Sequence, residues 1–281
     1  MALQLSNPAL LLSLVLAFLV LFAVARKAQP AQDASGTAFV GDQAVVSHGN
    51  LVSQGHTLKV ASFNIQTGKS DKGKRDISRA ANQLANVDIA GVQEVYAPTW
   101  ANILGLGRSQ SQAIASPGRF NYVFNATRKR WFREHRGNAV LARVAVESWQ
   151  TTMLPDQSGK SYRNYTVVNA KWNDTPFVFI NTHLHTSKGR TEQLNKVLEE
   201  FAQHSRAILV GDFNSRGSEL ALSELRQNPL VTDAIAQQNL DPNESERIDW
   251  IFTKGFSVVG GEYAPKGVSD HPYYEVHLQI N

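Results

Sequence analysis

Several short apolar runs in this chain lead into polar side chains that can bind a cation or move a proton. Residues 207–210, Ala-Ile-Leu-Val, are followed by Asp212 and Asn214, and residues 269–271 read Ser-Asp-His. Apolar runs of this length are typical of strands that are covered on both faces. The pattern predicts an α/β fold with a polar site at the strand ends, although Asp212 and Asn214 alone are also compatible with a simple Asx turn.

Further apolar runs show the same arrangement, with a polar ligand where each run stops. Carboxylate and amide oxygens bind hard cations, and an imidazole can donate or accept a proton. We therefore expect the ends of these runs to contribute to the same site. The runs and their polar ends are 58–63 with Asn64, 89–92 with Glu94, and 177–180 with His183.

One acid lies within an apolar run instead of after it. Asp249 stands between Ile248 and Trp250 in the run 247–252. A buried carboxylate without a partner destabilises a fold substantially. Asp249 is therefore expected to contact a cation or a hydrogen-bond donor from another part of the chain.

Segments with helical periodicity separate the apolar runs. Apolar residues recur at helical spacing in residues 74–87 and 190–204, and a third helix is expected over 217–227. Residues 256–263 and 273–280 are expected to form closing strands. Strands that alternate with helices, with hairpins toward the ends, indicate a single α/β domain.

The polar residues occur in an order that resembles the endonuclease/exonuclease/phosphatase superfamily, which includes deoxyribonuclease I. The resemblance extends from about residue 57 to the C-terminus. It implies a four-layer α/β sandwich, in which two stacked mixed β-sheets are flanked by helices and the active site lies along one edge of the sheets. The residues that carry it are, in order, Asn64, Glu94, His183, Asp212, Asn214, Asp249, Asp270 and His271.

The resemblance also implies a reaction, the cleavage of a P–O bond by in-line attack of activated water. Asp212 would activate the water and Asn214 would hold the phosphate, whereas Asp249 would orient His271. His183 would stabilise the transition state or protonate the leaving oxygen. The implied sets are the metal ligands Asn64, Glu94 and Asp270, and the catalytic residues His183, Asp212, Asn214, Asp249 and His271.

The charge of a phosphate ester favours a metal-assisted reaction. A divalent cation and one or two imidazolium groups must offset the negative charge that grows on the non-bridging oxygens. The chain contains no cysteine, which excludes a thiolate nucleophile and a cysteine-bound zinc. Carboxylate and amide ligands fit Mg²⁺, and Mn²⁺ accepts similar ligands.

A basic segment indicates the class of substrate. Residues 128–136 combine arginine and lysine with Trp131 and Phe132, which is typical of a nucleic-acid surface, although a solvated hairpin arm is the simpler alternative. The resemblance implies that Arg136 and Asn138 contact the substrate phosphate. Nucleic acid is therefore the favoured partner, and an endonuclease or other phosphodiesterase is the favoured activity.

Two alternatives to a nuclease stay open. A phosphatase or phospholipase-type enzyme that acts on lipid or sugar phosphates would use the same chemistry, because specificity depends on loops such as residues 96–117. A catalytically silent member that binds phosphate is the second alternative, although intact acids and histidines weigh against it. The sequence gives no sign of an obligate protein partner. The net charge of +4 permits nucleic-acid binding without identifying it.

The N-terminal region carries a separate signal. Residues 1–27 are expected to form a signal peptide or membrane anchor, residues 28–56 a flexible linker, and residues 57–281 the catalytic domain. If uncleaved, the first segment would bind a membrane. The expected location of the domain is exported, periplasmic or secreted, or anchored outside the cytoplasm. Arg26 and Lys27 follow the apolar run directly, which leaves an anchor that faces the cytoplasm as an alternative.

Overall fold

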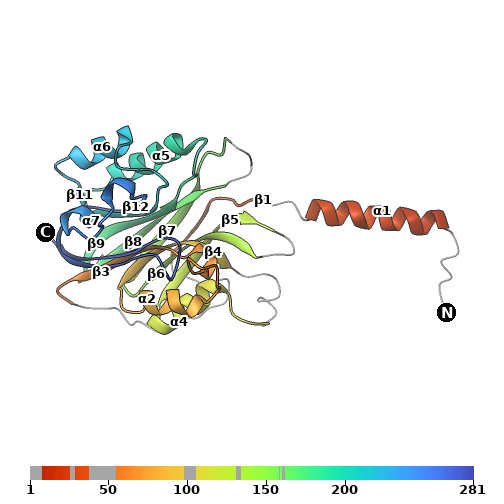
Figure 1. The fold of residues 1–281 in the computed structure, drawn as a ribbon, viewed down its shortest axis with the longest axis horizontal. Helices are drawn as coiled ribbons and strands as arrows, with labels where there is room; N and C mark the ends of the chain where they lie inside the picture. Colours follow the sequence, from red (N-terminus) through yellow and green to blue (C-terminus); the bar gives the residue numbers. More distant parts are fainter. Residues whose placement is uncertain are drawn as a thin grey trace.

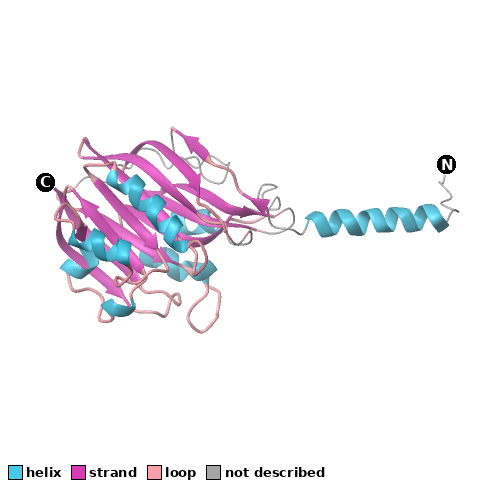
Figure 2. Ribbon diagram, turned by 90° about the horizontal axis from the view of Figure 1, so that it is seen from above, coloured by secondary structure: helices cyan, strands magenta, loops and turns pink. Residues whose placement is uncertain are grey.

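The computed structural model describes residues 8–25, 29–37, 55–97, 106–130, 134–157, 159 and 162–281. Within these residues, two seven-stranded mixed sheets stack face to face, and helices cover both outer faces (Figures 1 and 2). This is the four-layer α/β sandwich that the sequence resemblance implied. The two sheets are named sheet A and sheet B below.

Sheet A holds the strands that carry Asn64 and Glu94, and sheet B holds those that carry His183, Asp212 and Asp249. Sheet A has the order β1 (Gln29–Pro30), β5 (Asn121–Lys129), β6 (His135–Ala142), β4 (Ile89–Ala97), β3 (Leu58–Asn64), β14 (Tyr273–Ile280) and β13 (Phe256–Ala264). Sheet B has the order β11 (Thr232–Asp233), β12 (Asp249–Lys254), β10 (Ala207–Asp212), β9 (Thr175–His183), β8 (Asn164–Trp172), β7 (Ala145–Met153) and β2 (Ala34–Gly36).

Parallel strand pairs in both sheets are joined by helices, as such pairs require. Helix α2 (Ile77–Leu84) connects β3 to β4, and α5 (Arg190–Ala202) connects β9 to β10. The side chain of Asp76 caps the start of α2 by accepting a hydrogen bond from the backbone N–H of Ser78. The helices predicted between these strands are thus present, with α2 shorter than the range expected for it.

The remaining helices are short. They comprise α4 (Gln110–Gly118), α6 (Leu220–Gln227), α7 (Ala234–Gln237) and the 3₁₀ turns η1 (Gln66–Gly68) and η2 (Glu244–Glu246). Helix α4 lies in the segment that was expected to be a loop. The side chain of Ser109 caps it, and Pro117 lies in its last turn, so only a short stretch of helical periodicity was available in the sequence.

Apolar side chains form three layers of core. Between the sheets, Val60 and Ile89 of sheet A pack in one cluster with Phe179 and Ile208 of sheet B. A second cluster packs α2 and α4 on the outer face of sheet A, and a third packs α5 and α6 on the outer face of sheet B. Rigid strands buried on both faces are good supports for a site at their ends.

The N-terminal segment differs from the flexible linker predicted over residues 28–56. Strand β1 pairs with β5 of sheet A and β2 pairs with β7 of sheet B, so the short segment between them bridges one edge of both sheets. The carboxylate of Asp33 fixes this bridge by accepting a hydrogen bond of 2.7 Å from the backbone N–H of Met153. Part of the predicted linker is therefore bound to the two-sheet domain, because backbone groups at the sheet edges were available for pairing.

Helix α1 (Pro8–Ala25) precedes this bridge and extends away from the two sheets (Figure 1). No helix among the described residues has the length and hydropathy needed to cross a membrane. The signal peptide or anchor expected over residues 1–27 stays a prediction.

Candidate active site

The register of three adjacent strands in sheet B assembles the centre of the site. Asp212, the last residue of β10, is paired with His183, the last residue of β9. On its other side Asp212 is paired with Asp249, the first residue of β12. Because neighbouring strands lie about 4.8 Å apart, this register places the three side chains in one row at the edge of the sheet.

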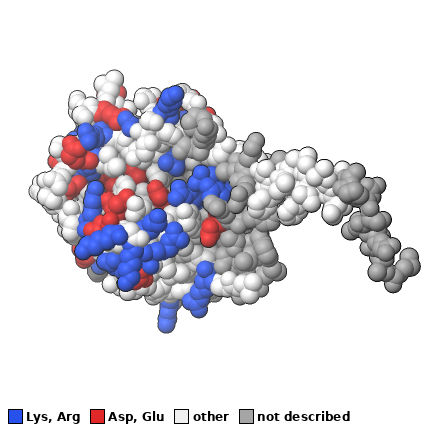
Figure 3. All heavy atoms as spheres, turned by 45° about the vertical axis from the view of Figure 1, so that its right-hand side comes forward, with Lys and Arg blue, Asp and Glu red and all other residues white. Residues whose placement is uncertain are grey.

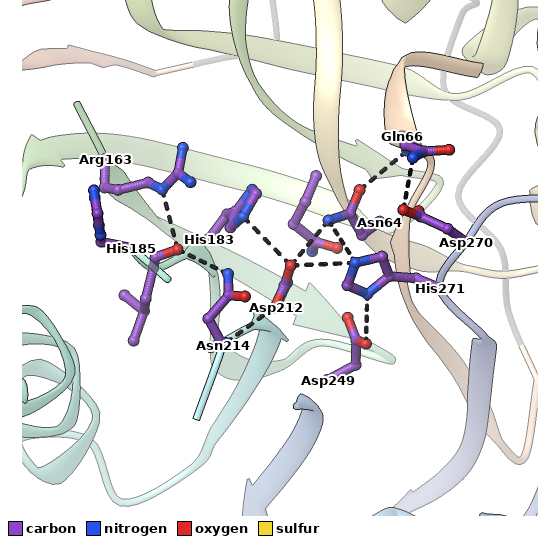
Figure 4. Close-up of polar contacts among 12 residues, drawn as sticks. Asn64, Gln66, Arg163, His183, His185, Asp212, Asn214, Asp249, Asp270 and His271 are labelled. Atoms are coloured by element: carbon purple, nitrogen blue, oxygen red, sulfur yellow. Dashed lines mark hydrogen bonds and ion pairs between the residues drawn. The ribbon is translucent and has the colours of Figure 1, made fainter. Parts of the chain in front are cut away.

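Asp212 is the hub of the polar contacts, which are shown in Figure 4. Its Oδ2 accepts a hydrogen bond of 2.9 Å from Nδ2 of Asn64, which belongs to sheet A. The same oxygen lies 3.3 Å from Nε2 of His183 and 3.7 Å from Nε2 of His271. One buried carboxylate oxygen therefore contacts an amide and two imidazoles that come from three different parts of the chain.

His271 carries a positive charge at neutral pH. Burial lowers its pKa, but Asp249, Asp212 and Asp270 outweigh burial and raise the pKa to about 10. Nδ1 of His271 lies 2.8 Å from Oδ2 of Asp249, and this contact fixes the orientation of the ring. The prediction that Asp249 needs a partner is confirmed.

The pKa of Asp212 is also raised, to about 7. Burial is the largest cause and the negative charge of Asp249 is the next, whereas His271 and the hydrogen bond from Asn64 lower the pKa. A carboxylate with a pKa near the working pH can accept a proton from water much more readily than an ordinary aspartate.

His183 differs from His271 because its pKa lies well below the usual value. Burial lowers the pKa most, and the positive charges of Arg163 and His271 lower it further. A neutral imidazole forms no ion pair, so Nε2 of His183 lies 3.3 Å from Oδ2 of Asp212 without a charge to balance that carboxylate. The expectation of one or two imidazolium groups reduces to one, on His271.

Asn214 follows Asp212 in an Asx turn. Its backbone N–H donates to Oδ1 of Asp212 over 2.9 Å, and its φ of 50° lies in the left-handed region that asparagine tolerates. Its side chain donates to the carbonyl oxygen of Leu184 over 3.0 Å, an oxygen that also accepts a hydrogen bond of 3.0 Å from Nε of Arg163. The Asx turn is therefore present and places Asn214 beside Asp212, whereas the catalytic roles of the two residues stay a prediction.

Asn64 and Asp270 are held together by Gln66. The backbone N–H of Gln66 donates to Oδ1 of Asn64 over 3.0 Å, and its side-chain Nε2 donates to Oδ2 of Asp270 over 2.6 Å. The hydroxyl of Ser269 donates to the carbonyl oxygen of Asn64 over 2.7 Å. These contacts join the end of β3 to the loop before β14, so two predicted metal ligands lie side by side.

Glu94 lies at an irregularity in β4. Its φ is 56°, and the pairing of β4 with β6 shifts register between Val92 and Val95. Such a bulge redirects a side chain away from the regular alternation. Glu94 consequently lines a pocket together with His183.

This pocket, named the arginine pocket, has a volume of about 110 Å³. The guanidinium of Arg136 donates to the hydroxyl of Tyr96 through Nε and Nη2, and it lies 5.3 Å from the centre of that ring. Burial lowers the pKa of Arg163, although a guanidinium keeps its charge at neutral pH. The residues that line the pocket are Glu94, Thr127, Arg128, Arg136, Gly137, Asn138, Tyr162, Arg163 and His183.

A larger hollow of about 550 Å³, named the acidic hollow, lies on the other side of the centre. Figure 3 shows acidic and basic side chains gathered close together on one face of the molecule. The acids of this hollow include Asp249 and Asp270, which raise the pKa of His271. Its lining residues are Asp241, Asn243, Glu246, Arg247, Ile248, Asp249, Tyr263, Pro265, Lys266, Asp270, His271, Pro272 and Tyr274.

Two groups of acids and a histidine among the described residues could hold a divalent cation. Asp212, Asp249 and His271 each bring one potential ligand atom within 4.8 Å of the others, and so do Glu262, Glu275 and His277. The metal ligands expected from the sequence, Asn64, Glu94 and Asp270, offer oxygen atoms only, and their role stays a prediction.

The two predicted substrate residues, Arg136 and Asn138, both line the arginine pocket. Asn138 is buried, and its Nδ2 donates to Oδ1 of Asn164 over 3.0 Å. The aromatic residues of the predicted basic segment, Trp131 and Phe132, lie outside the described residues.

Sequence reasoning did not find Arg163, Gln66 or Tyr96. Arg163 directly precedes β8, so the pattern of polar residues at strand ends could have indicated it. Gln66 lies in a turn with a left-handed φ of 45°, for which the sequence carries no clear signal.

A model of the Endonuclease/Exonuclease/phosphatase family matches residues 61–271. The chain belongs to this family. Members of the family hydrolyse phosphoric esters, which agrees with the order of the acids and histidines. No curated protein sequence matches the chain.

Several solved structures share the fold of this chain at low sequence identity. An endonuclease/exonuclease/phosphatase from Beutenbergia cavernae has a TM-score of 0.66 and 20% identity, over 81% of this chain and 72% of that one. The mannosyl-6-phosphatase of Bacteroides thetaiotaomicron has a TM-score of 0.60 and 21% identity, over 79% and 100% of the two chains. TDP2 from D. rerio, complexed with a single-strand DNA product, has a TM-score of 0.57 and 15% identity, over 80% and 100%.

Proposed function

We propose that this family member is a divalent-metal-dependent phosphodiesterase that cleaves nucleic acid by in-line attack of water. The observation that carries the proposal is the position of Asp212, whose carboxylate lies between neutral His183 and charged His271 and has a pKa raised to about 7. This arrangement provides a base and an acid within reach of one phosphoryl group.

Each side chain then has a definite task. Asp212 takes a proton from the attacking water, and Asn214 helps to hold the phosphate. His271 places its charge against a non-bridging oxygen, while Asp249 maintains that charge. His183, with its lowered pKa, donates a hydrogen bond from a neutral ring to the phosphate or to the leaving oxygen.

Asn64, Glu94 and Asp270 fit a hard divalent ion, because their donor atoms are oxygens and Gln66 holds two of them together. Mg²⁺ is the proposed ion, and Mn²⁺ is expected to replace it. The ion would supply electrostatic stabilisation of the charge that develops on the phosphate.

The arginine pocket supports an anionic substrate. Arg128, Arg136 and Arg163 line it next to Glu94 and His183, so a phosphate that reaches the centre passes beside their positive charges. Guanidinium groups match phosphate oxygens in geometry and charge. A nucleic acid presents repeated phosphates to such a surface.

One observation favours a second candidate, a phosphatase that acts on a sugar phosphate. The arginine pocket measures only about 110 Å³, which suits one terminal phosphate group. A mannosyl-6-phosphatase has the same fold, which supports this second candidate.

The first experiment tests the chemistry. The full chain, stripped of metal with EDTA, is assayed on bis(p-nitrophenyl) phosphate before and after addition of Mg²⁺ or Mn²⁺. Activity that returns only with the metal is expected. Full activity without metal would contradict the proposed metal dependence, and no hydrolysis under any condition would favour a silent member.

The second experiment separates the two substrates. A covalently closed circular plasmid has no terminal phosphate, so its conversion to nicked circles requires a phosphodiesterase. We expect nicking by the parent and none by His271→Ala. Hydrolysis of mannose 6-phosphate or p-nitrophenyl phosphate without nicking would instead identify a phosphatase.

A further inference from the structure

A buried amide pair connects the two sheets directly behind the site. Gln93 of β4 and Asn181 of β9 are both buried, with exposed fractions of 0% and 1%. Nε2 of Gln93 donates to Oδ1 of Asn181 over 2.8 Å, and Nδ2 of Asn181 donates to the carbonyl oxygen of Ala139 over 3.0 Å. The pair therefore ties β4 and β6 of sheet A to β9 of sheet B.

The surrounding backbone is shaped to admit this pair. A Cβ atom on Gly91 would lie 2.6 Å from Oδ1 of Asn181 and 2.4 Å from Cγ2 of Val210. Contacts that short do not occur in proteins, so a glycine is required for Asn181 to approach β4. The pair is thus part of the packing between the sheets, where most other contacts are apolar.

The pair is adjacent in sequence to two residues of the site. Gln93 immediately precedes Glu94, which has a left-handed φ of 56° at the bulge in β4. Asn181 lies two residues before His183, so the two side chains project from the same face of β9. A bond between Gln93 and Asn181 consequently fixes the distance between the strands that carry Glu94 and His183.

The pair is also imperfectly satisfied. Oε1 of Gln93 is buried and has no hydrogen-bond partner among the described residues. A buried acceptor without a partner lowers stability relative to an apolar side chain of similar shape. If Gln93 served packing alone, an apolar side chain in its place would make the protein more stable. The presence of a glutamine therefore points to a role in the site.

We propose that Gln93 and Asn181 are positioning residues, an inter-sheet clamp that holds Glu94 at the metal and His183 at the phosphate. The clamp rests on the proposed function, because it acts through the residues assigned there. It adds two residues that touch neither the substrate nor the metal but set the geometry of those that do.

The test uses near-isosteric apolar replacements in the full chain: Gln93→Met, Asn181→Leu and the double variant. Binding of Mn²⁺ alone is followed by electron paramagnetic resonance. The kcat on bis(p-nitrophenyl) phosphate is measured at saturating Mn²⁺. We expect each single variant to bind Mn²⁺ about tenfold more weakly. The double variant should bind Mn²⁺ only slightly more weakly than either single variant, since both substitutions remove the same hydrogen bond. Asn181→Leu should also lower kcat at saturating Mn²⁺, because His183 is displaced.

The matched control is Asn125→Leu, which removes another buried bond between the sheets, from Nδ2 of Asn125 to the hydroxyl of Thr166. It should lower the melting temperature and leave Mn²⁺ affinity unchanged. The proposed clamp is contradicted if folded Gln93→Met has an affinity for Mn²⁺ within about twofold of that of the parent. A parent that binds no Mn²⁺ would instead overturn the proposed function, so the two failures give different results.

Discussion

The two histidines of the site differ in charge because they line different hollows. His183 lies in the arginine pocket, where burial and the charge of Arg163 lower its pKa. His271 lies in the acidic hollow, where Asp249 and its neighbours overcome burial and raise its pKa to about 10. Both rings lie within 3.7 Å of the same oxygen of Asp212. Over so short a distance, the charges around each ring decide its protonation.

The two histidines are expected to have different roles in the site because their pKa values differ. The acids of the acidic hollow raise the pKa of His271, and the arginines of the arginine pocket, which lower the pKa of His183, would attract the proposed anionic substrate. Asp212, between them, keeps a pKa near neutrality because burial and Asp249 oppose His271. A site with two imidazolium groups would hold Asp212 too firmly in its charged form for it to be an effective base.

The largest effect is expected when Asp212 or His271 loses its ionisable group. Asp212→Asn and His271→Ala should each lower kcat on bis(p-nitrophenyl) phosphate by about 1,000-fold or more, because proton transfer or charge stabilisation is lost. His277→Ala is the matched control, since His277 also lies beside an acid, Glu275, but outside the site. Retention of a tenth of the parent activity in either of the first two variants would contradict the assigned roles.

The difference in charge between the histidines can be tested by glutamine, which donates a hydrogen bond but carries no charge. His183→Gln should lower kcat only about 10- to 100-fold, because a neutral donor is replaced by another. His271→Gln should lower kcat as much as His271→Ala, because the charge is lost. Equal losses in the two glutamine variants would show that the histidines carry the same charge.

A smaller effect is expected in the arginine pocket. Arg163→Ala should raise KM for a short oligonucleotide about tenfold and change kcat less, since one charged contact with phosphate is lost. Steady-state kinetics at two salt concentrations would measure this, with Lys196→Ala on the exposed face of α5 as the control. An unchanged KM for Arg163→Ala would show that Arg163 does not contribute to substrate binding.

The smallest effect is on stability and concerns the acidic hollow. The folded pKa of His271, about 10, exceeds the unfolded value of about 6.5, so its stabilising contribution is complete below pH 6.5 and is lost as pH rises through 10. In the metal-free protein, Asp249→Asn should lower this pKa, and stability should then fall less steeply between pH 7.5 and 9. NMR of the imidazole and urea unfolding would measure both, and an unchanged pKa would exclude Asp249 as its cause.

The strand-end pattern of the sequence was a reliable guide to the fold and to the centre of the site. Asn64, His183 and Asp212 occur at strand ends, where an apolar run stops, and the structure brings these ends together. The need of Asp249 for a partner was also predictable, because a buried carboxylate is unstable alone.

Other features depended on contacts that no local pattern encodes. The segment containing β1 and β2 was expected to be a free linker, yet it pairs with sheet edges more than ninety residues away. Gln66 contacts Asp270 across a separation of 204 residues. Such residues look ordinary in sequence because their partners are distant.

By itself, the sequence determined the family, the alternation of strands and helices, and the types of side chain available for phosphate chemistry, since these depend on residue order and periodicity. The tertiary structure decided which histidine is charged, which way Glu94 points and how the two sheets are joined behind the site. These properties depend on burial and on the charges of residues from distant segments, and both come into existence only when the sheets stack.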